Sequence, residues 1–129
     1  MPVLELHKTF RFESAHFLPH VPEGHKCRRI HGHSFQVVVH VRGPVDPEKG
    51  WVVDYADVER AWAPLQAQLD HRLLNEVPGL ENPTSEMLAL WLLERFVVEG
   101  AKVHAIRVEE TCRSACTVYA DEDVPTEAS

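Results

Sequence analysis

The chain has 129 residues, a hydrophobic content of 44% and a formal net charge of −7, of which −4 lies in the last nine residues. We expect one globular domain over residues 1–120 and a disordered acidic tail over residues 121–129. The acidic balance argues against a nucleic-acid partner. No stretch approaches the roughly 18 apolar residues of a membrane helix and no signal sequence is recognisable, so we expect a cytoplasmic protein without membrane contact.

The first part of the chain predicts strands separated by a long loop. Residues 3–13 alternate apolar and polar side chains, and residues 33–42 are rich in β-branched and aromatic residues. Between them, residues 17–30 contain prolines and a glycine that break regular structure, and a loop of this length in a small domain is usually functional. A short extended run is predicted at residues 51–53.

The middle of the chain predicts two helices. Apolar residues spaced three or four apart follow Asp54, a good N-cap, and Pro64 inside this pattern predicts a kink or an irregular join. The second helix is predicted to begin at Thr84 or Ser85 and to end at Gly100 as its C-cap.

Two further strands are predicted at residues 103–111 and 115–120, where β-branched residues return. Strands at both ends of the chain surround two helices in this reading. This order is typical of an α+β fold, in which helices cover one face of an antiparallel sheet.

Three histidines are predicted to meet at one point. His31 and His33 lie two apart in an extended segment, so their side chains point to the same face. If the first two strands pair antiparallel, His16 at the end of the first comes close to both. Three neutral imidazoles with an open fourth position are typical of catalytic zinc, so we expect Zn²⁺ here. The alternative is a hydrogen-bonded loop histidine beside a solvated pair.

Cys27 lies four residues before His31, in a basic run. It is either a fourth metal ligand or a reactive thiol beside the metal, because positive neighbours lower a thiol pKa. An odd number of cysteines, three, argues against a disulfide framework. The surrounding Lys26, Arg28 and Arg29 form a basic patch that would attract a phosphorylated substrate. A solvated loop with an inert cysteine is the alternative.

Two other places carry carboxylates of interest. Asp70 and His71 are adjacent, so they face each other only where the backbone is irregular, as a catalytic dyad or a polar cap. Glu110 shares the apolar face of its strand, and we expect it at a wet edge or bound to adjacent N–H donors such as a guanidine-like ring edge. Cys112 and Cys116 are expected to be small core residues.

These residues, in this order, resemble a known family. The matching blocks are His16, CRRIHGH, GWVVDYADV, LDHRLLN, ENPTSE and VEETC. They are similar to the 6-pyruvoyltetrahydropterin synthase family, and more closely to its bacterial branch, the 6-carboxytetrahydropterin synthases of the queuosine pathway. The similarity covers about residues 3–120. It implies a T-fold: two helices on a four-stranded antiparallel sheet, trimers that close a barrel, and hexamers of stacked trimers. The additional short strand that we predict at residues 51–53 would extend the second hairpin.

The resemblance also implies an activity and roles for individual residues. The activity is conversion of 7,8-dihydroneopterin triphosphate to 6-carboxytetrahydropterin with loss of acetaldehyde and triphosphate. Carried over by position, the roles are zinc ligands for His16, His31 and His33, catalysis for Cys27 with Asp70 and His71, and pterin anchoring for Glu110. The basic residues Lys26, Arg28 and Arg29 are our own candidates for triphosphate contacts.

Two other functions fit the same residues. One is 6-pyruvoyltetrahydropterin synthase activity, which uses the same substrate but eliminates triphosphate without cutting the side chain. The other is a non-catalytic zinc or pterin-binding module with Cys27 as the fourth ligand. The sequence does not separate side-chain cleavage from elimination, and it does not identify the native metal or the stability of the oligomer.

Overall fold

A computed structural model describes residues 2–111 and 114–120. In this part of the chain, four strands form one antiparallel sheet in the order β1-β2-β3-β4. The strands are β1 (Val3–His16), β2 (His31–Pro44), β3 (Lys102–Glu110) and β4 (Ser114–Tyr119). The helices are α1 (Tyr55–Leu69) and α2 (Ser85–Arg95), with short 3₁₀ helices η1 (Lys26–Arg28) and η2 (Leu74–Glu76).

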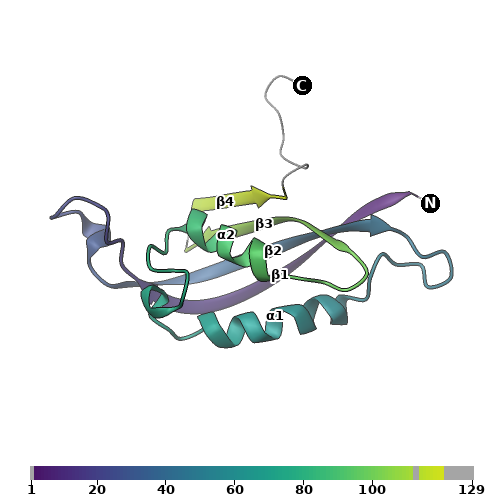
Figure 1. Cartoon of the computed structure of the whole chain (residues 1–129), viewed down its shortest axis with the longest axis horizontal. Coiled ribbons are helices and arrows are strands. Elements are labelled where there is room, and N and C mark those ends of the chain that lie inside the picture. The colour runs from purple at the N-terminus through teal and green to yellow at the C-terminus, as the bar shows by residue number, and fades with distance from the viewer. Residues whose placement is uncertain (1, 112–113, 121–129) are drawn as a thin grey trace, which may run out of the picture.

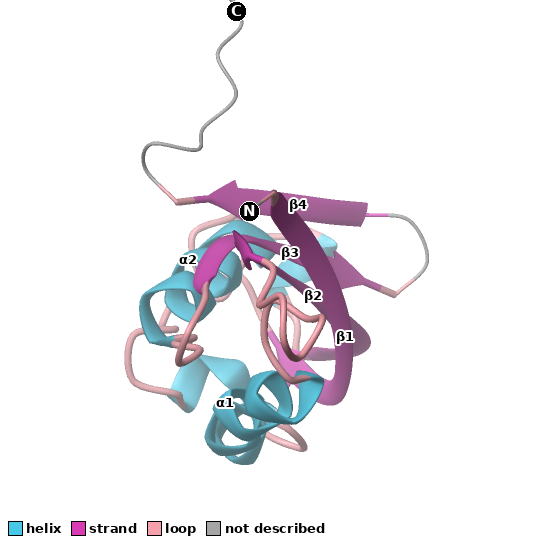
Figure 2. Cartoon of the chain, turned by 90° about the vertical axis from the view of Figure 1, so that its right-hand side faces the viewer, coloured by secondary structure: helices cyan, strands magenta, loops and turns pink. Residues whose placement is uncertain are grey.

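Both main helices lie on the same side of the curved sheet, as Figure 2 shows. This confirms the predicted α+β fold with helices on one face. Neither helix of the described part of the chain has the length and apolar character that a membrane crossing requires. The predicted disorder of residues 121–129 and the predicted core position of Cys112 fall outside the described residues.

The first two strands are longer than the sequence pattern predicts. β1 continues to His16 and β2 already begins at His31, because the two residues are paired in the register of the ladder. The prediction of a strand at residues 51–53 was wrong, since this segment forms bends. Its backbone closes the loop instead: the N–H of Asp46 donates to the carbonyl of Trp51, 2.8 Å away.

Helix α1 begins as the sequence predicts, with the Asp54 carboxylate accepting the N–H of Ala56 at 2.9 Å. It then runs without interruption through Pro64, so the predicted irregular join is absent from this helix. A proline removes the hydrogen bond to the carbonyl four residues earlier, here that of Arg60. Both residues are exposed, so this carbonyl lies on the side of the helix that water reaches.

Helix α2 starts after its N-cap Thr84 but ends at Arg95, five residues before the predicted C-cap Gly100. Phe96 and Val98 are buried while Val97 is 75% exposed. This alternation is that of extended chain, in which neighbouring side chains point to opposite sides. The prediction that the helix continues to Gly100 was wrong, because the apolar residues after Arg95 are buried in an extended segment and not in a further turn of helix.

The core lies between the sheet and the two helices. Phe12 and Phe35 of neighbouring strands stack with ring centroids 4.9 Å apart, and Trp62 of α1 packs beside Phe12. Burying side chains of this size contributes about 1.5–3 kcal/mol each to the free energy of unfolding. This packing holds the ends of β1 and β2 in a fixed position.

Candidate metal and active site

Four strand ends meet at one end of the sheet, on the left in Figure 1. β1 ends at His16, β2 begins at His31, β3 ends at Glu110 and β4 begins at Ser114. The ladder pairs His16 with His31 and Glu110 with Ser114. Residues more than 90 positions apart in the sequence are therefore brought to one place by strand pairing.

The three predicted metal ligands lie together at this end. One side-chain nitrogen from each of His16, His31 and His33 lies within 4.8 Å of the others. Their ring centroids are 4.6 to 5.2 Å apart, and the rings meet edge to face. The prediction that antiparallel pairing brings His16 to the other two is confirmed.

Hydrogen bonds fix the tautomers of two of these rings. The Nδ1–H of His16 donates to the carbonyl of Pro83 at 2.8 Å, and the Nδ1–H of His31 donates to the carbonyl of Arg29 at 2.7 Å. Each ring then offers Nε2 as a ligand, which is the usual way in which a metal-binding histidine is oriented.

Burial keeps the His16 ring neutral. Only 2% of His16 is exposed. Burial, and next the neighbouring His31 and His33, lower the pKa of His16 to about 4, against the hydrogen bond to Pro83. Neutral imidazoles are the protonation state that binds metal. The donor set of this cluster therefore fits a metal ion.

The cluster lines a hollow of about 830 Å³, a size typical of sites for small molecules. Cys27 and Lys26 of η1 line the same hollow, as do His16, His31, His33 and Glu110. The loop carrying η1 is tied to the end of β1, because the N–H of Leu18 donates to the carbonyl of Cys27 at 2.8 Å. The predicted thiol, the carboxylate and the histidines thus share one cavity.

Glu110 lies at the end of β3, where the sheet meets the hollow. One of its carboxylate oxygens is 3.9 Å from Nε2 of His33, and 21% of its side chain is exposed. It pairs with Phe35 in the ladder to β2. The sequence expectation of a carboxylate at a wet edge matches this position.

The three basic residues around Cys27 have different surroundings. Lys26 lines the hollow. The Arg28 guanidinium instead donates to the carbonyls of Val21 at 2.9 Å and Pro19 at 3.5 Å, which ties the loop to itself. The backbone carbonyl of Arg29 holds the His31 ring. Of the three, Lys26 is in the best position to meet a bound anion.

Asp70 and His71 form the predicted pair through an irregular backbone. His71 has a φ of 55°, a left-handed conformation that is uncommon outside glycine. Its Nδ1–H donates to one carboxylate oxygen of Asp70 at 2.9 Å, while the other oxygen accepts the N–H of Glu13 at 2.9 Å. The Glu13 N–H, and next the His71 ring, lower the pKa of Asp70.

The single chain does not bring this pair into the hollow of Cys27. Asp70 and His71 are absent from its lining, and the His71 side chain is 79% exposed. His71 lines a neighbouring hollow of about 600 Å³, and among the described residues the two hollows have His33 and Thr111 in common. In one chain, Cys27 and His71 thus line two different hollows, and their cooperation stays a prediction.

The structure adds lining residues that sequence reasoning missed. Four hydroxyl side chains, a carboxylate and a thiol also line the larger hollow: Thr84, Ser85, Thr111, Ser114, Glu86 and Cys116. Cys116 packs partly against the core as expected but also faces this cavity. The polar residues at the start of α2, next to Pro83, are a sequence signal that could have pointed to Thr84 and Ser85 as lining residues.

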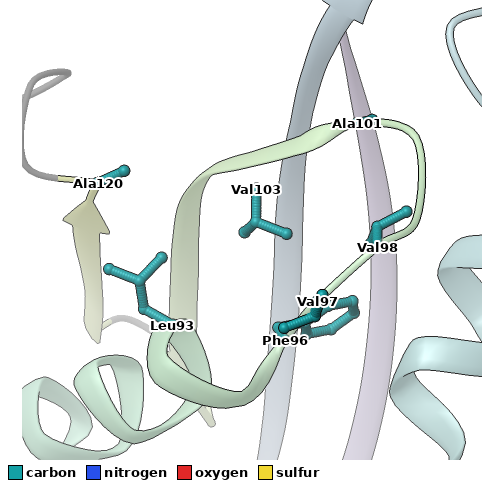
Figure 3. Close-up of a pocket in the computed structure, with 7 residues that line it drawn as sticks. All are labelled: Leu93, Phe96, Val97, Val98, Ala101, Val103 and Ala120. Atoms are coloured by element: carbon teal, nitrogen blue, oxygen red, sulfur yellow. The ribbon is translucent and has the colours of Figure 1, made fainter.

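A third hollow, of about 400 Å³, lies at the end of α2 and is shown in Figure 3. Within residues 2–111 and 114–120, its lining consists of leucine, phenylalanine, valine and alanine side chains. None of these groups can ligate a metal or transfer a proton, so the candidate site is the hollow that contains the histidines.

Comparisons with known proteins all point to one protein family. A family model described as 6-pyruvoyl tetrahydropterin synthase matches residues 5–121. A Synechocystis protein named 6-carboxy-5,6,7,8-tetrahydropterin synthase is 42% identical over 120 residues, which are 88% of this chain and 92% of that protein. An Archaeoglobus fulgidus protein with the same name, qualified as putative, is 40% identical over 77% of this chain and 81% of its own.

The fold agrees with this result. The solved structure of Caenorhabditis elegans 6-pyruvoyl tetrahydropterin synthase superposes with a TM-score of 0.85 and 26% identity, over 94% of this chain and 98% of that one. The four-stranded antiparallel sheet with two helices is thus the T-fold of these proteins. The chain belongs to the 6-pyruvoyl tetrahydropterin synthase family of enzymes.

Proposed function

We propose that this enzyme is a zinc-dependent carbon–carbon lyase that converts 7,8-dihydroneopterin triphosphate to 6-carboxytetrahydropterin, releasing acetaldehyde and triphosphate, in queuosine biosynthesis. The observation that carries the proposal is the common cavity of the three histidines, Cys27 and Glu110. The names of the relatives described above support the choice of reaction within the family.

His16, His31 and His33 would hold the zinc ion. When bound, zinc supplies a Lewis acid that makes protons next to a developing carbonyl more acidic. The chain's own contribution is to keep the His16 ring neutral through burial, and to aim the His16 and His31 rings through the carbonyls of Pro83 and Arg29. A rigid ligand set of this kind avoids reorganisation during the reaction.

Cys27 and Glu110 act on the substrate from the wall of the cavity that both of them line. Glu110 accepts adjacent N–H groups of the pterin ring, which a carboxylate does with two oxygens at once. Cys27, as thiolate, removes a proton from the substrate side chain. Triphosphate leaves as this proton is removed, one water adds to the side-chain carbonyl next to the ring, and the carbon–carbon bond then breaks in retro-aldol fashion. The water oxygen ends in the carboxyl group of the product, and the other two side-chain carbons leave as acetaldehyde. Lys26, which lines the cavity, meets the triphosphate.

His71 relays the proton, oriented by its hydrogen bond to Asp70. Since His71 and Cys27 line different hollows of one chain, we propose that they meet between neighbouring copies in a trimeric barrel, two of which stack as a hexamer. In the described residues β1 and β4 are paired on one side only, which leaves two strand edges for such an assembly.

The test is to incubate the zinc-loaded protein with 7,8-dihydroneopterin triphosphate and identify the products. Acetaldehyde together with 6-carboxytetrahydropterin supports the proposal. Release of triphosphate without acetaldehyde would assign the chain to the elimination reaction instead. A protein that binds the pterin but does not turn it over would be the non-catalytic module.

A further inference from the structure

A second cluster of metal-binding side chains lies on the opposite face of the sheet from the helices. His7 and His40 are paired across β1 and β2. They alternate with Leu6 and Val39, which pack in the core, so their side chains point away from the helices. Glu5 shares this outer face. No role in the proposed reaction involves any of these residues.

The three side chains are close enough to share one ion. One carboxylate oxygen of Glu5 is 2.7 Å from Nε2 of His7 and 3.4 Å from Nδ1 of His40. Their ligand atoms all lie within 4.8 Å of one another. Four ligands placed tetrahedrally around zinc at about 2.0–2.2 Å are separated from one another by roughly 3.3–3.6 Å. The distance from the Glu5 oxygen to His40 already has this value, whereas the shorter contact with His7 is a hydrogen bond that the ion would replace.

The second oxygen of Glu5 is held from the other side. Nε and Nη2 of Arg42 lie 3.2 and 3.1 Å from it, and Nε2 of His104 lies 3.5 Å from it. The His104 ring in turn meets the ring of Tyr119 edge to face, with centroids 5.8 Å apart. Partners of this kind orient a ligating carboxylate, so the oxygen that faces His7 and His40 keeps its direction.

We propose that Glu5, His7 and His40 bind a second divalent transition-metal ion, separate from that of the histidine cluster at the strand ends. Imidazole with one carboxylate suits zinc and its neighbours in the first transition row. The rings of His7 and His40 stack with centroids 3.9 Å apart, so one ring must tilt to aim its nitrogen at the ion. The His7 side chain is 52% exposed and has room to do so.

Such an ion would join β1 to β2 on the sheet face that points away from the helices. The positive charge of Arg42 beside Glu5 lowers the affinity for a cation, so we expect this site to bind metal more weakly than the histidine cluster. The inference does not rest on the proposed reaction. Each site has its own ligands, and their occupancies can be counted separately.

The experiment is to load metal-free protein with Zn²⁺, remove the excess and count ions per chain by elemental analysis. We expect two ions in the wild type, one in His7→Ala, one in His31→Ala and none in the double variant. His20→Ala, which removes an exposed loop histidine, is the matched control and keeps two. One ion in the wild type, or two in a His7→Ala variant, overturns the proposal.

A measurement on the unaltered protein covers the case in which a variant does not fold. Zn²⁺ is titrated into the ¹⁵N-histidine-labelled wild type. We expect the second equivalent to shift the ring signals of His7 and His40 and to leave those of His20 unchanged. A second equivalent that shifts neither of the two rings contradicts the proposal.

Discussion

The ring of His16 donates a hydrogen bond to the carbonyl oxygen of Pro83, 2.8 Å away and 67 residues later in the chain. Proline lacks a backbone N–H but keeps its carbonyl, so Pro83 can still accept a hydrogen bond. The bond joins the end of β1 to the start of α2. The orientation of this proposed metal ligand therefore depends on a loop that lies far away in the sequence.

Asn75 connects the two segments that carry His16 and Pro83. Its side-chain oxygen accepts the N–H of Phe17 at 3.0 Å, and its amide donates to the carbonyls of Phe17 at 2.8 Å and Glu81 at 3.5 Å. It thus clamps the residue after His16 to the loop that carries Pro83. We predict that Asn75→Ala lowers zinc affinity about 10- to 100-fold, by loss of ligand orientation.

Competition with a metal-sensitive dye measures this affinity. Gln68→Ala, at an exposed amide on α1, is the control and is expected to bind zinc like the wild type. An unchanged affinity in Asn75→Ala would show that the His16 ring is oriented without the clamp.

The low pKa of His16 predicts a pH-dependent stability of the metal-free protein. Its folded value of about 4 lies below the ordinary 6.5, so the unfolded chain binds more protons between these values. Stability contributed by the neutral ring is present above pH 6.5 and is lost as the pH falls toward 4. From pH 7 to pH 5 the loss is about 2 kcal/mol.

Urea unfolding at both pH values, with the wild type and with His16→Gln, tests this prediction. The variant should lose about 2 kcal/mol less than the wild type over the same interval. Equal losses in the two proteins would exclude His16 as the group responsible.

Cys27 is predicted to act as a base and not as a ligand. Cys27→Ala should lower turnover about 10²- to 10⁴-fold, the usual contribution of a positioned general base, and leave the zinc content unchanged. Thiol titration of the zinc-loaded wild type should find Cys27 reactive. Wild-type turnover in the zinc-bound variant would remove the role given to the thiol.

Glu110 and its neighbour Glu109 provide a matched pair. Glu110 faces the cavity, whereas Glu109 accepts the side-chain amide of Gln36 at 3.0 Å on the other face of the sheet. Loss of a hydrogen bond to a charged group costs about 1.5–3 kcal/mol, so Glu110→Gln should raise KM roughly 10- to 100-fold. Steady-state kinetics should show no such rise for Glu109→Gln.

A shared active site predicts complementation between inactive variants. Cys27→Ala and His71→Ala are each expected to have little activity. When the two are unfolded together and refolded, mixed oligomers contain sites with both native residues, and activity should return. Each variant refolded alone is the control. No recovery, despite mixed oligomers detected by native mass spectrometry, would place both residues in the same chain's site.

The sequence by itself determined the parts of this protein that depend on local periodicity. His31 and His33 lie on one face because side chains alternate along a strand, and α1 begins after its N-cap Asp54. Asp70 and His71 are neighbours in sequence, so their side chains can form a hydrogen bond only where the backbone is irregular. These features follow from the two-residue period of strands and the chemistry of helix ends. Six motif blocks in a fixed order were enough to identify the family.

Tertiary structure decided what depends on long-range packing. Phe96 and Val98 are buried in an extended segment where the sequence pattern predicts helix. The carbonyl of Pro83 accepts a hydrogen bond from His16, 67 residues earlier in the chain. Strand register placed His7 against His40. Contacts of this kind join residues far apart in the chain, and their energies come from surfaces that meet only after folding, so no local pattern contains them.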